Sequence, residues 1–272
     1  MLSLLNEYSF FVGWVVLGMK ILVAVKQVPE RDATVTVAAD GRWIDEEDLA
    51  YTINEPDAYA LEEALQLKEK NGGEVVVLCA GPERVTSTLR EALAKGADRA
   101  IHVEFDEMGS LDTLGLAKML AEAVKGEAPD LILTGLQSDD LGLGQTGVVL
   151  AELLGMPHAT IIMQVEKTDT GLRVKRELED GWFQHVEMPL PALLTIQSGG
   201  NKLRYATLMG IKRAKTKETA TVTPSGDAGV AALELVKVYL PEKVKKTEML
   251  TGSAADVAAQ LVEKLKFDVR VL

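Results

Sequence analysis

Residues 131–147, with the sequence LILTGLQSDDLGLGQTG, join a short apolar run to a glycine-rich polar loop and the start of a helix. The run Leu131–Leu133 favours a strand that is buried on both faces. Tight turns and a close approach of the backbone to a ligand are permitted by four glycines, Gly135, Gly142, Gly144 and Gly147. Free N–H groups and the helix dipole make the N-terminus of the following helix an anion site, for which phosphate is the expected guest.

This loop is neither a Walker A sequence nor a GxGxxG fingerprint, and it contains no lysine. The pattern therefore predicts an anion at a strand–loop–helix junction without naming a nucleotide, and a plain glycine-rich turn is the alternative. Asp139 and Asp140 could bind a metal or orient a ribose. Acceptance of backbone N–H bonds within the loop is the simpler interpretation of these two side chains.

Few other residues are of types that could act as catalysts or bind a metal. Cys79 lies in an apolar run and is interpreted as a small core residue, and His158 follows Pro157 and is interpreted as structural. No local signature of a Ser/His/Asp or Cys/His set is visible, and the three histidines show no zinc spacing. We therefore expect no catalytic residue and no metal site in this chain.

The composition narrows the class of protein. The chain has 272 residues, which is enough for one large α/β domain with or without a smaller appendage. A net charge of -12 disfavours nucleic-acid binding, which needs clustered lysine and arginine. A single cysteine excludes an internal disulfide framework, so the composition is typical of a cytoplasmic protein.

Residues 1–18 are apolar, but Asn6 and Glu7 interrupt the run and leave it too short to span a bilayer comfortably. The segment also lacks the basic region and cleavage site of a secretory signal. The simplest interpretation is that the fold begins at Met19. Residues 1–18 are then a misassigned start or a disordered extension, and a weak membrane anchor is the alternative.

From Met19 onward, buried strands alternate with helices. Strand patterns at 19–28, 72–82, 99–104 and 131–135 are separated by helical patterns at 58–70, 83–95 and 111–125. Repeated units of this kind predict an α/β fold, with a parallel twisted sheet and helices on both of its faces. Ligands in such folds bind at the carboxyl ends of the strands, here near Lys26–Gln27, Cys79–Gly81, Glu104 and Gly135–Gln137.

The pattern changes after Pro157. Alternation over 165–186, with a turn at 168–171, predicts an antiparallel hairpin, and residues 188–197 predict another buried strand. The apolar cluster 205–209 precedes a basic stretch at 212–217. A charged stretch is usually a solvated face, whereas exposed apolar residues rimmed by charge often mark a docking site.

The C-terminal arm contains a capping box at Ser253 and Asp256, followed by a helix with Val257, Leu261 and Leu265 on one face. The arm has too few apolar residues for a core of its own, so we expect it to pack on another surface. The predicted organisation is an N-terminal extension at 1–18, an α/β nucleotide-binding domain at 19–205, and a docking loop with the C-terminal arm at 206–272.

From Met19 to the C-terminus, the chain resembles the beta subunit of electron transfer flavoprotein. The resemblance rests on ILVAVKQVP, NEPDAYALEEALQLKE, ALAKGADRAIHV, the GLQSDD and QTG parts of the loop, and LRYATLMGIKRAKTK. It implies an adenine-nucleotide-binding, Rossmann-like fold and a heterodimer in which an alpha subunit carries the redox-active FAD. The beta-subunit pocket would hold AMP, or a second FAD in electron-bifurcating members, and the QTG ending is closer to the AMP type.

The resemblance also implies a set of cofactor-binding positions. These are Ala24, Asn54, Glu55, Pro56, Asp57, Ala80, Gly135, Leu136, Gln137, Ser138, Asp139, Asp140, Leu141, Gly142, Leu143, Gly144, Gln145 and Thr146. Two departures stand out. The family commonly has Asn-Pro where this chain has Asn54-Glu55-Pro56, and its acidic triplet is here Asp140-Leu141-Gly142.

The implied function is an electron carrier subunit without substrate turnover of its own. It would support the alpha-subunit FAD, pack its C-terminal arm on the alpha subunit, and dock acyl-CoA-type flavin dehydrogenases of fatty acid oxidation through Tyr205, Leu208 and Met209. Electrons would pass through a quinone-reducing acceptor to the respiratory chain. The alternatives are an electron-bifurcating member, a stress-protein-like ATP-binding module, and an adenylating hydrolase or ligase, for which no catalytic group is apparent at the loop.

Overall fold

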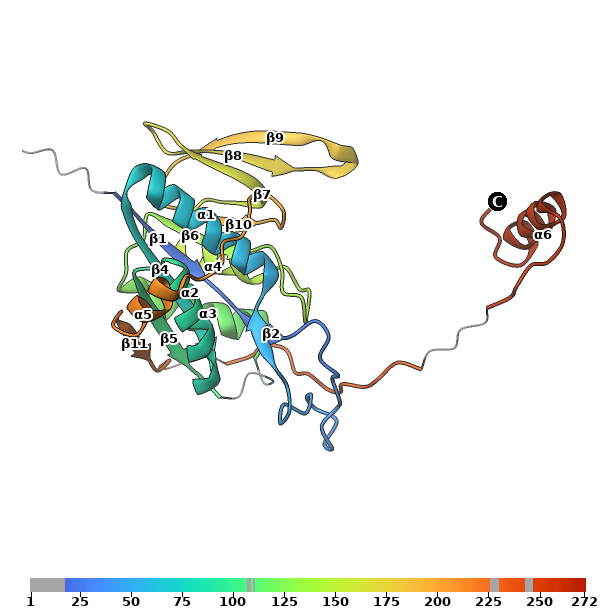
Figure 1. Cartoon of the computed structure of the whole chain (residues 1–272), viewed down its shortest axis with the longest axis horizontal. Helices are drawn as coiled ribbons and strands as arrows, with labels where there is room; N and C mark the ends of the chain where they lie inside the picture. Colours follow the sequence, from blue (N-terminus) through green and yellow to red (C-terminus); the bar gives the residue numbers. More distant parts are fainter. Residues whose placement is uncertain (1–17, 107–108, 110, 226–229, 243–246) are drawn as a thin grey trace, which may run out of the picture. The chain divides into compact units, whose positions relative to one another are not determined.

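The computed structural model describes residues 18–106, 109, 111–225, 230–242 and 247–272 (Figure 1). Contacts divide the chain into two units, one that ends at Val238 and one that comprises Tyr239–Leu272. The predicted N-terminal extension lies outside the described residues, apart from Gly18. The two units are therefore described separately.

Among the described residues, one sheet contains nine strands in the order β11-β5-β4-β1-β6-β10-β7-β8-β9. Its parallel strands are β1 (Met19–Ala24), β4 (Gly73–Gly81), β5 (Arg99–Glu104), β6 (Leu131–Gly135), β7 (His158–Lys167), β10 (Ala192–Ile196) and β11 (Thr219–Val222). β1 lies at the centre, with Ile21 opposite Val75 of β4 and Leu131 of β6. The predicted parallel sheet is confirmed.

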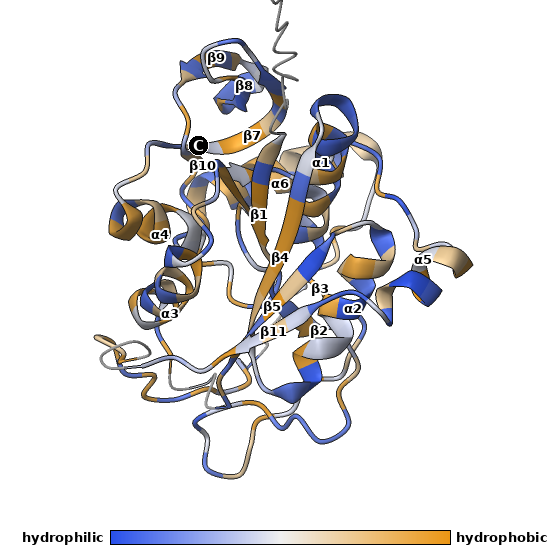
Figure 2. Ribbon diagram, turned by 90° about the vertical axis from the view of Figure 1, so that its left-hand side faces the viewer, coloured by the Kyte–Doolittle hydropathy of each residue, from blue (hydrophilic) through white to orange (hydrophobic). Residues whose placement is uncertain are grey.

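Helices cover both faces of this sheet. They are α1 (Glu55–Asn71), α2 (Thr86–Lys95), α3 (Thr113–Lys125) and α4 (Thr146–Leu154). Because side chains alternate along a strand, Ile21 of β1 packs in the core beneath α1 and α2, whereas Leu22 packs beneath α3 and α4. Figure 2 shows the hydrophobic strands enclosed between these two pairs of helices.

The antiparallel part of the sheet is formed by β7, β8 (Leu172–Glu177) and β9 (Phe183–Met188). Leu172 lies opposite Lys167 on one side and Met188 on the other. A short 3-10 turn, η3 (Glu179–Gly181), joins β8 to β9. The predicted antiparallel hairpin is thus confirmed, and it extends to His158 because β7 also pairs in parallel with β10.

Several short elements had no prediction. They are β3 (Tyr51–Ile53), α5 (Leu208–Ala214) and β11. In contrast, β2 (Gln27–Pro29) overlaps the end of the strand predicted at 19–28, and the 3-10 turn η1 (Glu83–Val85) begins the helix predicted at 83–95. Elements of three to seven residues hold too few residues for a periodic pattern and depend on tertiary packing. Within the basic stretch, Lys217 is half-buried, and its Nζ donates hydrogen bonds to the carbonyls of Leu93 and Ala97.

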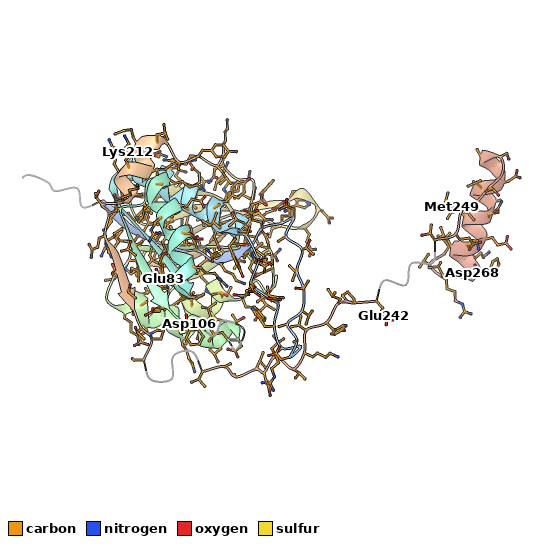
Figure 3. The ribbon with its side chains drawn as sticks, turned by 60° about the horizontal axis from the view of Figure 1, so that its bottom comes forward. Glu83, Asp106, Lys212, Glu242, Met249 and Asp268 are labelled. Carbon is orange, nitrogen blue, oxygen red and sulfur yellow. The ribbon has the colours of Figure 1, made fainter. Side chains whose placement is uncertain are left out.

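The second unit is built around α6 (Ala254–Phe267). The predicted capping box is confirmed, because the Ser253 hydroxyl accepts from the Asp256 N–H and the Asp256 carboxylate accepts from the Ser253 N–H. No described residue of α6 is buried, and Met249 before it is 80% exposed (Figure 3). The apolar side chains of this unit therefore form no core of their own.

Candidate functional site

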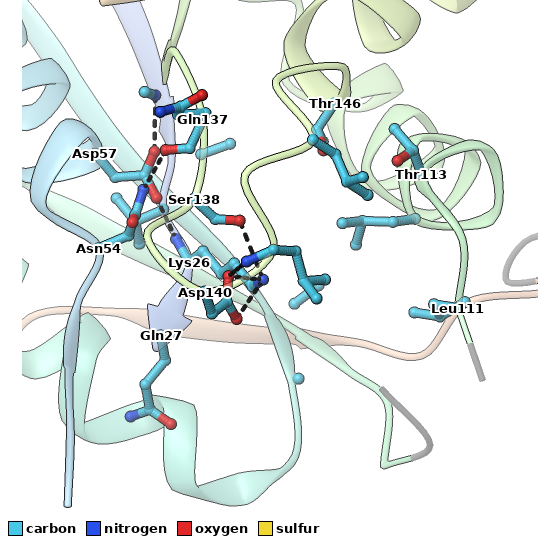
Figure 4. Close-up of a pocket in the computed structure, with 18 of the residues that line it drawn as sticks. Lys26, Gln27, Asn54, Asp57, Leu111, Thr113, Gln137, Ser138, Asp140 and Thr146 are labelled. Atoms are coloured by element: carbon cyan, nitrogen blue, oxygen red, sulfur yellow. Dashed lines mark hydrogen bonds and ion pairs between the residues drawn. The ribbon is translucent and has the colours of Figure 1, made fainter. Parts of the chain in front are cut away.

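A cavity opens at the edge of the sheet where β1, β4 and β6 end (Figure 4). The strand order reverses between β1 and β6, because the chain passes from β1 to β4 on one side and reaches β6 on the other. Ligands of parallel sheets bind at such a reversal, where strand ends and helix N-termini meet. The empty space at this site, including the open solvent at its mouth, is about 1300 Å³.

Asp57, in the first turn of α1, joins the ends of β1 and β6. Its Oδ1 accepts a hydrogen bond from the Gly135 N–H at 2.7 Å, and its Oδ2 accepts one from the Lys26 N–H at 2.8 Å. Burial raises the pKa of Asp57 to about 6, although both N–H donors oppose that shift. Only glycine fits at position 135, since a Cβ there would lie 2.4 Å from Asp57 Oδ1.

Asn54 holds the first part of the loop at 136–145. Its Nδ2 donates to the Gln137 carbonyl at 3.0 Å, and its Oδ1 accepts from the Asp139 N–H at 2.9 Å. Asn54 precedes α1 but does not cap it with its side chain. Both polar atoms of the Asn54 amide therefore bond to the loop, and the start of α1 forms one wall of the cavity.

Lys26 ties the loop to the end of β1 across the cavity mouth. Its Nζ lies 2.7 Å from Asp140 Oδ1 and 3.5 Å from the Ser138 hydroxyl. Burial alone would raise the pKa of Asp140, but the Lys26 ammonium, together with hydrogen bonds from Ser138 and the Leu141 N–H, lowers it. The loop sequence contains no lysine, so tertiary structure supplies the cation. The only feature of the sequence that pointed to Lys26 was its position at the end of a predicted strand.

The N-terminus of α4 faces the same cavity. Gln145, Thr146 and Gly147 all line it, and Gln145 makes no side-chain cap hydrogen bond. The N–H groups of the first turn therefore have no side-chain acceptor from the capping position. Gly147 permits close packing beneath the loop, because a Cβ there would lie 2.6 Å from Thr134 Oγ1. This arrangement can accept an anion such as a phosphate.

The opposite wall of the cavity is apolar. Leu111, Leu116 and Leu120 line it from α3 and the residues before it, and Leu141 and Leu143 line it from the loop. Leu141 and Leu143 are 53% and 56% exposed, which leaves apolar surface at the mouth of the cavity. Apolar walls with a few polar groups are typical of sites that bind a flat organic ring.

A second polar cluster borders the cavity beside β2 and β3. Arg84 Nη1 donates to Gln27 Oε1 at 2.9 Å, and Arg84 Nη2 donates to Glu46 Oε2 at 2.8 Å. The Arg84 guanidinium also lies 4.1 Å from the centre of the Tyr51 ring. Sequence analysis named the strand end at Gln27 but missed Glu46, Tyr51 and Arg84, because these three residues come from separate segments. Lys26, Trp43 and Leu111 also line the cavity.

Most positions implied by the family resemblance line this cavity. They are Ala24, Asn54, Asp57, Ala80, Gly135, Leu136, Gln137, Ser138, Asp140, Leu141, Leu143, Gly144, Gln145 and Thr146. The described lining does not include Glu55, Pro56, Asp139 or Gly142. Glu55 instead pairs with Arg31 at 2.7 Å, and Asp139 Oδ2 accepts from the Glu55 N–H at 3.3 Å.

The predicted docking residues lie elsewhere, at the start of α5. Tyr205 is 91% exposed, Leu208 is 82% exposed and Met209 is 57% exposed. Leu208 is the first residue of α5, and Thr207 caps this helix by accepting a hydrogen bond from the Gly210 N–H. The three side chains are therefore exposed, Tyr205 just before α5 and the other two in its first turn.

Comparison with known proteins agrees with this geometry. Residues 42–227 match the model of the electron transfer flavoprotein domain. A relative named electron transfer flavoprotein subunit beta, from Methylophilus methylotrophus, is 40% identical over 257 residues, which cover 90% of this chain and 97% of the relative. The chain belongs to the electron transfer flavoprotein family, as a subunit of the beta type.

Other beta subunits of electron transfer flavoprotein show the same coverage. The protein of that name from Bradyrhizobium diazoefficiens is 39% identical over 93% of this chain and 100% of its own length. The one from Bacillus subtilis is 32% identical over the same share of each chain. These matches therefore cover nearly the full length of the relatives and most of this chain.

The described lining of the electron transfer flavoprotein cavity contains no histidine and no cysteine. Cys79 lies in the hydrophobic core, as predicted, and burial raises the pKa of its thiol to about 12. In the part of the chain that the structure describes, no helix is long and apolar enough to cross a membrane.

Proposed function

We propose that this chain is the beta subunit of a heterodimeric electron carrier and binds an adenine nucleotide in its cavity. The observation that carries this proposal is the uncapped N-terminus of α4, which opens into a cavity at the strand-order reversal of the sheet. Helix N-termini in this position bind phosphate through free N–H groups and the helix dipole.

AMP is the nucleotide that we propose, and its parts match distinct walls of the cavity. A phosphate would lie near Gln145 and Thr146, and an adenine ring would lie against the strand ends at Ala24 and Ala80. AMP supplies no redox chemistry, so its role here is structural. A second FAD would use the same phosphate position and is the alternative.

The test is to co-express the chain with its alpha subunit, denature the purified heterodimer, and identify the released nucleotides by chromatography and mass. We expect one FAD and one AMP per heterodimer. Two FAD per heterodimer would contradict the AMP proposal and support the electron-bifurcating alternative. One FAD without a second nucleotide would contradict the proposed role of the cavity. ATP on a homodimer would indicate a stress-protein-like module.

Within the carrier, we propose that the alpha subunit holds the redox-active FAD and that flavin chemistry occurs there. This chain supports that cofactor and presents Leu208 to flavin dehydrogenases of the acyl-CoA type. Exposed apolar residues beside charged ones, such as Leu208 beside Lys212, are typical of docking surfaces. We further propose that the carrier passes its electrons through a quinone-reducing acceptor to the respiratory chain, and that it is located in the cytoplasm.

We also propose that residues 239–272 pack on the alpha subunit. The support for this is that α6 buries none of its described residues within its own unit, although Leu261 and Val262 are apolar. Removal of residues 239–272 should leave the first unit folded and weaken heterodimer formation. Analytical ultracentrifugation measures both, and full heterodimer affinity in the truncated chain would overturn the proposal.

A further inference from the structure

Residues 197–207 lead from β10 to α5 without forming a helix or a strand, but they are bonded to α1. Asn201 Nδ2 donates to Glu63 Oε2 at 3.1 Å and to the Tyr59 carbonyl at 3.4 Å. Further along, the Arg204 N–H donates to Glu62 Oε2 at 3.3 Å. This connecting segment therefore follows α1 until it reaches the exposed Tyr205.

The Arg204 guanidinium makes two forked contacts with α1. Its Nε and Nη2 donate to the two oxygens of Glu62 at 2.8 and 3.0 Å. Its Nη1 and Nη2 donate to the two oxygens of Glu69 at 2.6 and 3.1 Å. Glu62 and Glu69 lie about two helical turns apart on one face of α1, so a single planar cation spans both.

These contacts are strong by their chemistry and their burial. Glu62 is 4% exposed, so its carboxylate depends on Arg204 for a counter-charge. The hydrogen bonds from Arg204 also lower the pKa of Glu69 and, reciprocally, the two carboxylates raise the pKa of Arg204. Removal of the arginine would leave a buried charge unpaired, which is why a gentler substitution is needed to test its role.

The other side of the docking helix is also fixed. α5 packs so closely on α2 that a Cβ at Gly210 would lie 2.2 Å from the Ala94 carbonyl oxygen. After α5, the Lys217 ammonium donates to the Leu93 carbonyl at 3.0 Å, at the end of α2. Leu208 is therefore exposed between two anchors, Arg204 before it and Lys217 after it.

We propose that Arg204 is a positioning residue for partner docking, because its double fork on α1 holds the connecting segment and with it Leu208 in the binding-competent position. This inference rests on the proposed docking role of Leu208. A partner that binds one arrangement of a mobile segment loses apparent affinity in proportion to the fraction in that arrangement. An exposed anchor that is held in place avoids this loss.

Arg204→Lys is the informative substitution because it keeps the positive charge and loses the planar fork. A lysine ammonium is a point charge that cannot bind both carboxylates in forked geometry. Arg99→Lys is the matched control, since Arg99 likewise bridges two carboxylates, those of Glu74 and Glu127, from the start of β5. Both substitutions remove one bridging guanidinium, but only Arg204→Lys changes the connecting segment at 197–207.

The experiment measures electron transfer to each purified heterodimer from the acyl-CoA dehydrogenase that reduces the wild-type carrier fastest, as a function of carrier concentration. We expect Arg204→Lys to raise KM for the carrier by about three- to tenfold with kcat unchanged, and Arg99→Lys to leave KM unchanged. In an Arg204→Lys background, Leu208→Ala should raise KM by a smaller factor than it does alone, because the two residues act through one contact.

The outcomes separate this inference from the docking proposal. If Leu208→Ala alone leaves KM unchanged, both ideas are wrong. If Leu208→Ala raises KM while Arg204→Lys behaves as Arg99→Lys, only the positioning role is overturned. Glu69→Gln guards against a folding defect, because the Glu69 side chain is 60% exposed and its loss leaves the Glu62 contact intact. It should raise KM by a smaller factor than Arg204→Lys, and an unchanged KM for both variants would contradict the proposal.

Discussion

Two segments of the first unit follow the neighbouring strands β6 and β10 and lead into helices, but they are fixed in different ways. The loop at 136–145 is fixed to the start of α1 by Asn54, through backbone groups of Gln137 and Asp139. The connecting segment at 197–207 is fixed further along α1 by Arg204, through the carboxylates of Glu62 and Glu69. The loop borders a cavity, whereas the connecting segment leads to exposed apolar residues.

The difference reflects what each segment must leave free. The loop keeps the N–H groups of α4 available for an anion, and it is fixed by the Asn54 amide, by the Lys26–Asp140 ion pair and by close packing at Gly135. The connecting segment leads to an apolar surface, so charged forks can fix it without competing for a ligand. Changes of volume should therefore disrupt the loop, whereas changes of fork geometry should disrupt the connecting segment.

The largest effect on stability is expected from a substitution that adds volume at the start of the loop. Gly135→Ala places a Cβ 2.4 Å from Asp57 Oδ1 and 2.7 Å from Pro56 Cβ, so the end of β6 must move. We expect a loss of about 3 kcal/mol in the free energy of unfolding, measured by urea denaturation of the heterodimer. Gly126→Ala is the control, because nothing lies within 4 Å of its Cβ position, and it should be neutral. Equal stability of both variants would show that the close packing does not matter.

The two segments should also differ in the sign of their pH dependence. Burial raises the folded-state pKa of Asp57 from its usual value to about 6. The folded state therefore holds this proton more tightly, and the free energy of unfolding falls as pH rises from about 4 to about 6, by as much as ~3 kcal/mol. Asp57→Asn should abolish this fall, and a slope that the substitution does not change would contradict it.

Glu69 in the connecting-segment contact should behave in the opposite way. Hydrogen bonding by Arg204 lowers its folded-state pKa, so its contribution to stability is present above its usual pKa and is lost as pH falls through the lowered value. Glu69→Gln should therefore reduce stability at neutral pH and lose its effect in acid. Urea denaturation across the same pH range compares both carboxylates in one experiment.

Thr146→Val tests the anion site at α4. The substitution removes a hydroxyl that can bond a phosphate oxygen and keeps the shape of the side chain, so nucleotide affinity should fall by about 1.5–3 kcal/mol. Nucleotide content per purified heterodimer is the measurement. Thr113→Val is the control, because Thr113 also lines the cavity but begins a helix that Asp112 already caps. Unchanged nucleotide content in Thr146→Val would contradict the proposal that the phosphate binds at this position.

Leu208→Ala tests the exposed surface and should have the smallest effect on the protein itself. An anchor that fills a partner pocket is worth about 2 kcal/mol, or roughly thirtyfold in affinity, when it is truncated. We expect slower electron transfer at limiting carrier concentration, with nucleotide content and melting temperature unchanged. Leu153→Ala is the control for an exposed leucine, here on α4. A large loss of thermal stability in Leu208→Ala would show that Leu208 contributes to the fold.

Much of the fold could be predicted from the sequence because it depends on local patterns. The strands at 99–104 and 131–135 and the capping box at Ser253 have the predicted bounds, since apolar runs and caps are properties of consecutive residues. The start of α1 differs by three residues, because Pro56 fits the first turn of a helix and does not end it. β11 was missed because four residues acquire strand structure only through pairing with β5.

The sequence by itself determined the order of the strands and helices, the glycine-rich loop before α4 and, through its resemblance, the family. Only the tertiary structure decided which charged residues meet. Lys26 and Asp140 are separated by 114 residues and Arg204 and Glu62 by 142, yet each pair lies within 2.8 Å. Periodicity reports the faces of a single element, whereas these contacts depend on how elements pack, and packing is set by the whole core.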